Sequence, residues 1–451
     1  MSHLNAETRG DSNDRSPISK IARYCFVIGI FCLFIFQLFV ADENSQVAML
    51  FSDSQSQQNE LQKISLPEVA RLIYATGFSL IMLSSLYFMI RTWHTVGIGY
   101  KLALGLMQVW MAMHVILAFS SGPKPSLPEI CGTKGPLTWI SCGIVFVGIS
   151  TSGWELAKKV FVFLVNIAAF VIVVKVTFSG SITSTEQQAG RFFVGYIPLL
   201  IWMAPFLVYD PCAVSISAFR IIFIIFPLFV LYISSILSGN RSWIIMMVMH
   251  TIIIGFKYRK TVLMRPRTSY IIILFVILSV WFVSEIYGEK LEDVTAFLSD
   301  SWYIDTRTDQ YKQFLSQVSL TDLLIGKGPR ATWFWSGREY EWIDGHFTLL
   351  AFNGGFILLS TYIIVIIWPA FWLLSKRPSW HYAAPAIILV FWTLAMMGLS
   401  TFTSVKASYE HAIISVLAGR SYYLAKSKDR EYLLNLNQIN VSCYNQNHIY
   451  M

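Results

Sequence analysis

The sequence predicts an all-α polytopic membrane protein with about twelve transmembrane helices and one large outer loop. Hydrophobic residues make up 55% of the chain, charged residues only 13%, and the mean hydropathy is +0.56. A single water-soluble core could not bury that much apolar surface. Apolar runs of about 20 residues, enough to cross a bilayer, recur along the chain. Lys and Arg also concentrate in alternate connections.

The candidate spans follow one another with short connections until residue 286, and three more follow the long loop. The fourth is interrupted by polar residues and the eighth is short. The candidate spans comprise residues 21–40, 72–90, 102–119, 137–154, 160–178, 192–209, 221–237, 243–256, 270–286, 356–374, 383–403 and 409–425.

The distribution of basic residues predicts the orientation, because Lys and Arg are retained on the cytoplasmic side. They gather before the first span, in the even-numbered connections and after the last span, whereas Lys175 and Arg420 fall within spans. Both termini are therefore expected in the cytoplasm and the long loop outside it. Anionic lipid headgroups explain the net charge of +8, so it gives no reason to expect a nucleic-acid partner.

The domain organisation follows from these spans. It comprises a cytoplasmic tail (1–20), nine spans (21–286), the outer loop (287–347), three spans (348–425) and a second tail (426–451). The first apolar segment lacks a small-residue cleavage site and is expected to be a retained signal anchor. The cysteines show no metal-ligand spacing. Packing or a disulfide between Cys131 and Cys142 both remain open.

The outer loop is the place to look for chemistry, since long loops without function are uncommon. A helix is expected to begin near Arg307, and Tyr311, Phe314 and Leu315 share one face at i, i+3 and i+4, which Val318 continues.

A short apolar piece, residues 323–325, reads as a strand that ends in the turn Gly326-Lys327-Gly328. Backbone amides in such a turn can approach a ligand closely, and phosphate is a natural guest. Aromatic residues with polar neighbours follow this turn. They suit sugar rings, but also the headgroup belt of a membrane. The aromatic candidates for sugar binding are Trp333, Trp335 and Tyr340.

Two further residues are candidates for chemistry. His346 introduces the tenth span and shares a helix face with Asn353, seven residues on. Near a helix N-terminus an imidazole stays neutral and can act as a general base, although an interfacial hydrogen-bonding role is the alternative. Arg241 lies in a tight outer turn beside the amides that open the eighth span, which suits an anion. Its alternative is a snorkelling membrane anchor.

These residues, in this order, resemble the O-antigen ligase and polymerase superfamily of bacterial envelope glycosyltransferases. The resemblance covers the span arrangement and four pieces of the second half. Two positions depart from the common pattern: Phe347 replaces an Asn after the histidine, and Ser242 replaces a Gly after the arginine. The four pieces are Ser238-Gly-Asn-Arg241-Ser242, Arg307-Thr-Asp-Gln-Tyr311, Gly326-Lys-Gly-Pro329 and His346-(x)6-Asn353-Gly-Gly355.

The resemblance implies an enzyme of the bacterial inner membrane whose periplasmic loop receives a glycan on undecaprenyl pyrophosphate. Arg241 and Arg307 would bind the pyrophosphate, and Arg330 or Lys327 would assist. His346 would take the proton of the acceptor hydroxyl. Two arginines can replace a divalent metal when the leaving group is a pyrophosphate. The resemblance therefore implies no metal or other cofactor, and direct displacement predicts inversion at the anomeric carbon.

Polymerisation of repeat units is favoured, with transfer of finished glycan to lipid A core as the alternative. A chain-length regulator protein is a further expected partner. A transporter or flippase with about twelve spans is the competing class. The second connection lacks the acidic and repeated basic residues of the major facilitator signature, and no long cytoplasmic loop joins two halves.

Overall fold

The computed structural model describes the greater part of the chain. The expectations for Arg241, Arg330, Cys131 and the ninth span lie outside the described residues. The described residues are 16–50, 68–120, 136–178, 196–209, 218–237, 243, 245–254, 306–328, 331–335, 337–340, 343, 345–378, 380–397 and 409–427.

The described chain is almost entirely helical, which confirms the helical membrane class. Three helical segments, 196–201, 245–254 and 409–427, add to the labelled elements. In chain order the labelled elements before the outer loop are α2 (Pro17–Leu50), α4 (Glu68–Thr92), η3 (Trp93–Thr95), α5 (Ile98–Ser120), α7 (Pro136–Ile149), α8 (Thr151–Phe178), η4 (Ala204–Tyr209) and α10 (Ala218–Leu237). From the loop onward they are α13 (Thr306–Gln317), α14 (Leu320–Ile325), β1 (Trp333–Trp335), β2 (Arg338–Tyr340), α15 (His346–Tyr362), the π-helical η6 (Ile363–Ile367), α16 (Trp368–Ser375) and α17 (Trp380–Met396).

Five of the described helices are long and apolar enough to cross a membrane, and four shorter apolar helices accompany them. The long ones include α2, expected as the signal anchor, and the stretch His346–Ser375, which is broken at Gly355. The protein is therefore a helical membrane protein, whereas the number of twelve spans stays a prediction. The five candidate spans are Pro17–Ala41, Glu68–Thr95, Ile98–Leu117, Thr151–Lys175 and His346–Ser375.

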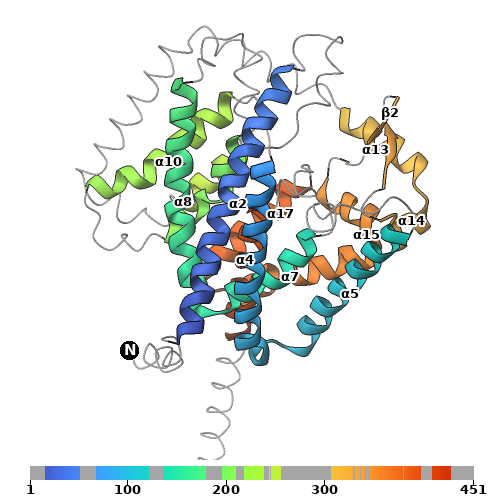
Figure 1. Cartoon of the computed structure of the whole chain (residues 1–451), viewed down its shortest axis with the longest axis horizontal. Coiled ribbons are helices and arrows are strands. Elements are labelled where there is room, and N and C mark those ends of the chain that lie inside the picture. The colour runs from blue at the N-terminus through green and yellow to red at the C-terminus, as the bar shows by residue number, and fades with distance from the viewer. Residues whose placement is uncertain are drawn as a thin grey trace, which may run out of the picture.

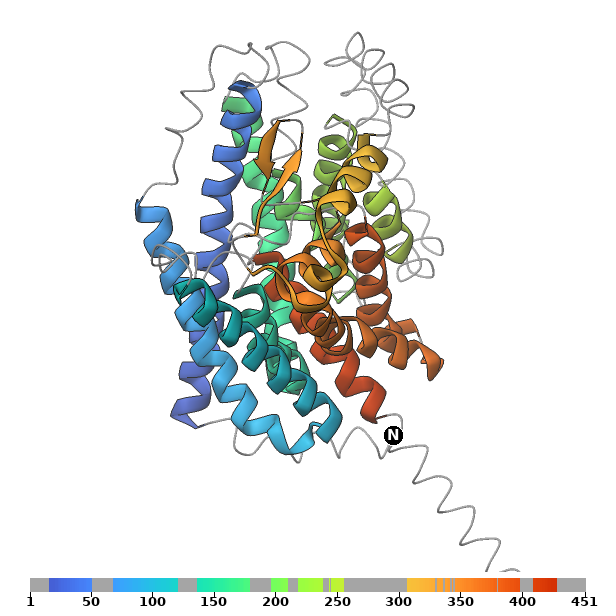
Figure 2. The same cartoon turned by 90° about the vertical axis from the view of Figure 1, so that its right-hand side faces the viewer.

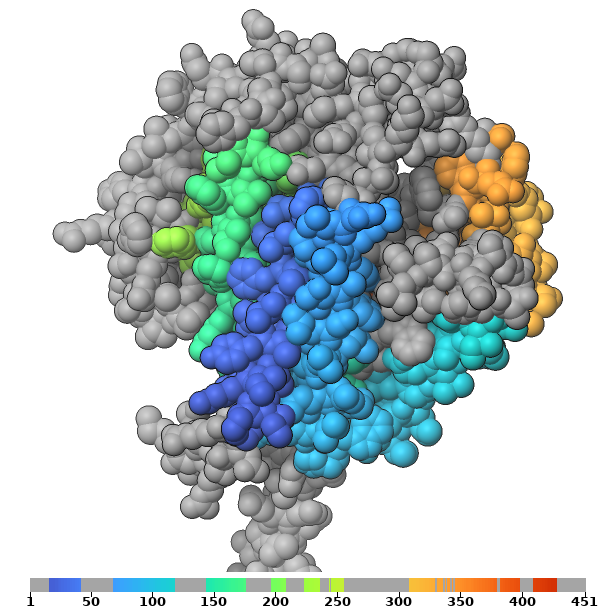
Figure 3. Space-filling view, in the orientation of Figure 1, coloured from blue at the N-terminus to red at the C-terminus, as the bar shows by residue number. Residues whose placement is uncertain are grey.

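Helices α2 and α4 lie side by side, and α8 runs along the other side of α2 (Figures 1 and 3). Gly29 of α2 and Gly77 of α4 face each other, and a Cβ built on Gly77 would lie 3.0 Å from the Gly29 carbonyl oxygen. Small residues let membrane helices approach closely where no hydrophobic effect draws them together. At this pair of glycines the two helices are close enough that a side chain on either one would clash.

The fourth and fifth predicted spans divide at a different residue than expected. The sequence suggested a cytoplasmic connection at Lys158 and Lys159, but both lie inside α8, and Ser150 separates α7 from α8. The Gly153 amide donates to Ser150 Oγ at 3.3 Å, so this hydroxyl caps the start of α8, as serine commonly does. The lysines still lie within the first turns after the break, and Lys158 pairs with Glu155.

The described part of the outer loop forms a small unit of α13, α14 and a two-stranded antiparallel hairpin, which the sequence did not predict (Figures 1 and 2). Trp333 pairs with Tyr340, and Trp335 with Arg338. The side-chain amide of Gln317 in α13 extends the edge of β1. It accepts from the Phe334 amide at 2.8 Å and donates to the Phe334 carbonyl at 2.7 Å. The hairpin is therefore fastened to α13 by hydrogen bonds.

Two expectations about this unit were partly wrong. The face of α13 that packs inward includes Phe314, with Val318 just beyond the helix, but Leu315 is 57% exposed. The apolar piece before the glycine turn is the helix α14, not a strand. A capping box starts it: the Asp322 amide donates to Ser319 Oγ at 3.1 Å, and the Ser319 amide donates to Asp322 Oδ2 at 2.9 Å. These reciprocal bonds satisfy two amides at the helix start.

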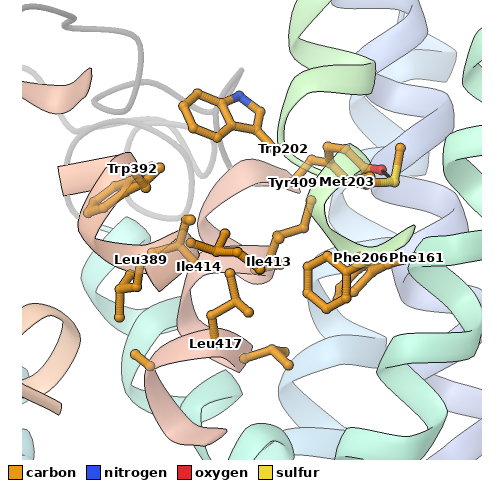
Figure 4. Close-up of a cluster of buried hydrophobic side chains, with 14 of the residues drawn as sticks. Phe161, Trp202, Met203, Phe206, Leu389, Trp392, Tyr409, Ile413, Ile414 and Leu417 are labelled. Atoms are coloured by element: carbon orange, nitrogen blue, oxygen red, sulfur yellow. Dashed lines mark hydrogen bonds between the residues drawn. The ribbon is translucent and has the colours of Figure 1, made fainter. Parts of the chain in front are cut away.

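The helical segment 409–427 occupies the middle of the hydrophobic core. Figure 4 shows Tyr409, Ile413 and Leu417 on it, between Leu389 of α17 on one side and Phe206 on the other. The Tyr409 hydroxyl donates to the Met203 sulfur. Where this segment crosses α7 the two helices touch closely, since a Cβ on Gly419 would overlap the Val145 carbonyl oxygen.

Candidate functional site

The glycine turn of the outer loop is docked onto α15. The Lys327 amide donates to the Phe352 carbonyl and the Gly328 amide to the Asn353 carbonyl, both at 2.8 Å. Gly326 has a φ of 90°, and a Cβ there would lie 2.5 Å from the Gly355 nitrogen. The two glycine-containing pieces that carry the family resemblance therefore form one backbone contact.

Helix α15 reverses direction at Gly355. This residue has φ 72° and ψ −179°, which lie outside the helical region. A straight helix would separate positions 346 and 362 by about 24 Å. The rings of His346 and Tyr362 are instead only 5.3 Å apart, centroid to centroid. Residues 346–354 therefore form a short helix that folds back on the longer one, and the predicted tenth span, 356–374, begins immediately after the reversal.

This reversal needs support where the helical hydrogen bonds are interrupted, because an unpaired carbonyl inside a membrane protein is costly. The Trp110 indole of α5 donates to the Gly354 carbonyl at 2.6 Å. On the other side, a Cβ on Gly355 would overlap the Leu324 carbonyl oxygen of α14. The reversal is thus held between α5 and α14.

Four buried rings meet beside the start of α15. The His346 ring lies 5.5 Å from His411 and 5.8 Å from Trp392, in addition to Tyr362. The Tyr362 hydroxyl and His411 Nε2 are 3.1 Å apart and form a hydrogen bond. We call these residues, His346, Tyr362, Trp392 and His411, the ring cluster. They come from both arms of α15, from α17 and from helix 409–427, so the cluster joins three segments of the chain.

His346 is the first residue of α15, as the sequence predicted, and Asn353 lies on the same short arm. Both are buried, His346 completely. The His346 ring meets the rings of Tyr362 and Trp392 in edge-on contacts, with ring centroids 5.3 and 5.8 Å apart.

Lys327 takes a different role from the one expected for its turn. Its Nζ lies 3.4 Å from Asp322 Oδ2 and 5.9 Å from the centre of the Phe352 ring. Burial alone would raise the pKa of Asp322, but hydrogen bonds from Ser319 and the charge of Lys327 lower it below its usual value. Because the Lys327 and Gly328 amides already bind α15 carbonyls, the predicted backbone cradle for phosphate is not formed by these two groups.

The predicted sugar-binding aromatics divide into two kinds. Trp333 is only 4% exposed and packs edge-on against Phe314, with ring centres 5.3 Å apart. It is therefore a core residue of the outer unit. Trp335 and Tyr340 are partly exposed and flank the Trp333 ring at 6.0 and 6.2 Å. Among the three, only these two keep accessible surface for a ligand.

Arg307 lies in the first turn of α13. One turn further along, the Tyr311 hydroxyl lies 3.5 Å from Thr348 Oγ1 in the first turn of α15. Position 307 is therefore one helical turn before the residue through which α13 meets α15.

The residues of the ring cluster other than His346 were missed by sequence reasoning. A signal was present for one of them: Glu410 and His411 stand together inside a predicted span, and polar residues there commonly mark function. Tyr362 and Trp392 carry no such signal, because aromatic residues are ordinary in apolar helices. Within the described ranges, no three His, Cys, Asp or Glu side chains gather at spacing suited to a metal ion.

No family model, curated protein or solved structure matches this chain.

Proposed function

We propose that the protein polymerises oligosaccharide repeat units carried on undecaprenyl pyrophosphate, at the periplasmic face of the bacterial inner membrane. The main support is the contact between the Gly326-Lys327-Gly328 turn and the reversal at Gly355. It joins the two glycine-containing pieces of the resemblance in one place. It also holds the outer unit against the arm of α15 that begins with His346.

The proposed reaction is a direct displacement without a metal ion. The acceptor sugar hydroxyl loses its proton to His346, and its oxygen attacks the anomeric carbon of the donor glycan. The bond to the pyrophosphate breaks, and Arg241 and Arg307 balance the charge that develops on it. Attack opposite to the leaving group inverts the anomeric configuration.

The burial of His346 adds a conformational step to this proposal. Its ring is 0% exposed, so the acceptor hydroxyl reaches it only after neighbouring groups move apart. The contact of Tyr311 with Thr348 closes the side on which α13 meets α15. Opening between these helices is therefore part of the proposed cycle, and binding of the donor to the outer unit is the event that would favour it.

The experiment that tests the function is the lipopolysaccharide profile of a strain lacking this protein. Loss of a polymerase leaves a single repeat unit on the core. Loss of a ligase leaves polymer attached to its lipid carrier and none on the core. A profile identical to that of the parent strain would contradict both enzyme functions and leave the transporter class.

A further inference from the structure

The helical segment 409–427 places several polar side chains in the hydrophobic core. Among the described residues of the chain, its completely or almost completely buried side chains include Glu410, His411, Ser415, Arg420 and Ser421. A polar residue buried in a membrane protein is expensive and usually has a functional or paired role. Arg420 is accounted for by its packing on the rings of Trp154 and Tyr423. His411 is the one that reaches the ring cluster.

We propose that His411 is a positioning residue for His346 and shares the proton that His346 takes up, with Tyr362 fixing the orientation of the His411 ring. This inference rests on the function proposed above. Its structural basis is the 5.5 Å separation of the two imidazole rings and the 3.1 Å hydrogen bond between Tyr362 Oη and His411 Nε2. Both histidines are 0% exposed in the closed arrangement, so both rings are shielded from bulk water until α13 and α15 move apart.

The proton balance of this step is simple. The O–H bond of the acceptor sugar breaks, its electron pair forms the new glycosidic bond, and the proton binds one nitrogen of His346. The opposite nitrogen of that ring then passes a proton toward His411, while Tyr362 keeps its hydrogen bond to Nε2 of His411. When the product leaves through the opening between α13 and α15, water that enters takes the proton from His346, and both rings return to the neutral form. Because either imidazole can carry the proton, the positive charge is shared between two rings, which costs less than holding it on one buried ring.

A purely structural His411 would be a ring that fills space beside Tyr362 and Trp392. That role requires shape but no basic nitrogen. The two roles therefore differ in their response to replacements that keep volume and remove basicity. Ser415 offers a matched control, because it is buried one helical turn further along the same face and its hydroxyl has no hydrogen-bond partner among the described residues.

The test uses the purified full chain in lipid nanodiscs with a lipid-linked repeat unit as substrate. His411→Gln keeps a polar group of similar reach but cannot hold a proton. We expect kcat to fall by about 10²-fold, the lower end of general-base contributions, with the KM for donor unchanged. Tyr362→Phe should lower kcat less, and Ser415→Ala should behave as wild type. Unchanged kcat in His411→Gln would overturn the inference.

A rescue experiment separates basicity from space filling. In His411→Ala, added imidazole should restore polymer formation, whereas pyrrole, a ring of the same shape without a basic nitrogen, should not. Equal rescue by pyrrole would overturn the proposal. If the alanine variant fails to fold, His411→Gln decides alone. A wild-type protein that forms no polymer would instead remove the proposed function, and this inference with it.

Discussion

Gly326 and Gly328 have nearly the same backbone conformation, with φ of 90° and 91°, but different surroundings. A side chain on Gly328 would meet nothing within 4 Å, whereas one on Gly326 would press on the backbone of α15. Gly328→Ala should therefore cost only the conformational strain, about 1–3 kcal/mol. Gly326→Ala should cost more, and should also separate the turn from α15. Thermal unfolding of the purified variants measures the difference. Equal losses would contradict the docked turn.

The arginines provide a second test at the residue scale. If Arg241 and Arg307 make forked contacts to pyrophosphate, lysine keeps the charge and loses the geometry. Arg→Lys at either position should then abolish most polymer while the amount of protein in the membrane stays constant. Arg91→Lys is the control, because Arg91 lies at the second connection, which is predicted to be on the cytoplasmic side. Full-length polymer from both site variants would remove this role.

At the scale of single residues the sequence predicted positions better than environments. His346 does begin a helix, and Gly326 and Gly328 do form a turn. The amides of that turn, however, bind α15 carbonyls in place of an anion. Leu315 faces outward because the inner face of α13 passes through Gln310 and Phe314. The spacing of apolar residues shows which residues share a helix face, but it does not show which part of the protein packs on that face.

The crossing of helix 409–427 and α7 gives a prediction about packing between elements. Gly419 and Gly148 form a reciprocal contact between helix 409–427 and α7, in which a Cβ on Gly148 would overlap the Val416 carbonyl oxygen. Gly419→Ala should destabilise the protein by about 1–3 kcal/mol, as overpacking does. Gly105→Ala in α5, where a Cβ would meet nothing within 4 Å, should stabilise it by up to about 1 kcal/mol. Thermal unfolding of the two purified variants gives the sign of each change, and changes of the same sign would contradict the close crossing.

The sequence predicted long helices well, because length and composition identify them. It predicted helix boundaries and short elements less well, because local hydrogen bonds determine these. Long apolar runs such as α2 and α4 need no further information. The division between α7 and α8 depends on a single serine cap, and α14 depends on the box formed by Ser319 and Asp322. The hairpin depends on pairing with its partner strand and on Gln317. A short apolar run alone does not distinguish helix from strand.

For the whole molecule the first expectation concerns topology. A reporter that is active only outside the cytoplasm should be active when inserted at Gln317 and inactive at Tyr258, because the basic eighth connection is retained inside. Gln317 ends α13 and its amide fastens the hairpin, so an adjacent exposed position, Ser316, serves as a second insertion point. Opposite signals would move the candidate site to the wrong side for a periplasmic donor.

The architecture of the site was only partly accessible from the sequence. The resemblance grouped His346 with the glycine pieces, and the structure brings the two glycine pieces into backbone contact. The ring cluster depends on the reversal at Gly355, which brings Tyr362 back to His346. In the sequence, the site of this reversal looks like an ordinary pair of glycines in an apolar helix. Contacts with helix 409–427 are long-range and leave no local pattern.

The most direct measurement of the central claim compares wild type, His346→Ala and His250→Ala in a purified assay with a lipid-linked repeat unit. His250 is also buried, 1% exposed, and serves as the matched histidine control. Wild type and His250→Ala should form a ladder of polymer. His346→Ala should bind the donor as tightly but form polymer about 10²- to 10⁴-fold more slowly. Turnover near the wild-type rate in His346→Ala would contradict the assignment of the base and transfer that role to another proton acceptor of the loop, such as Glu339.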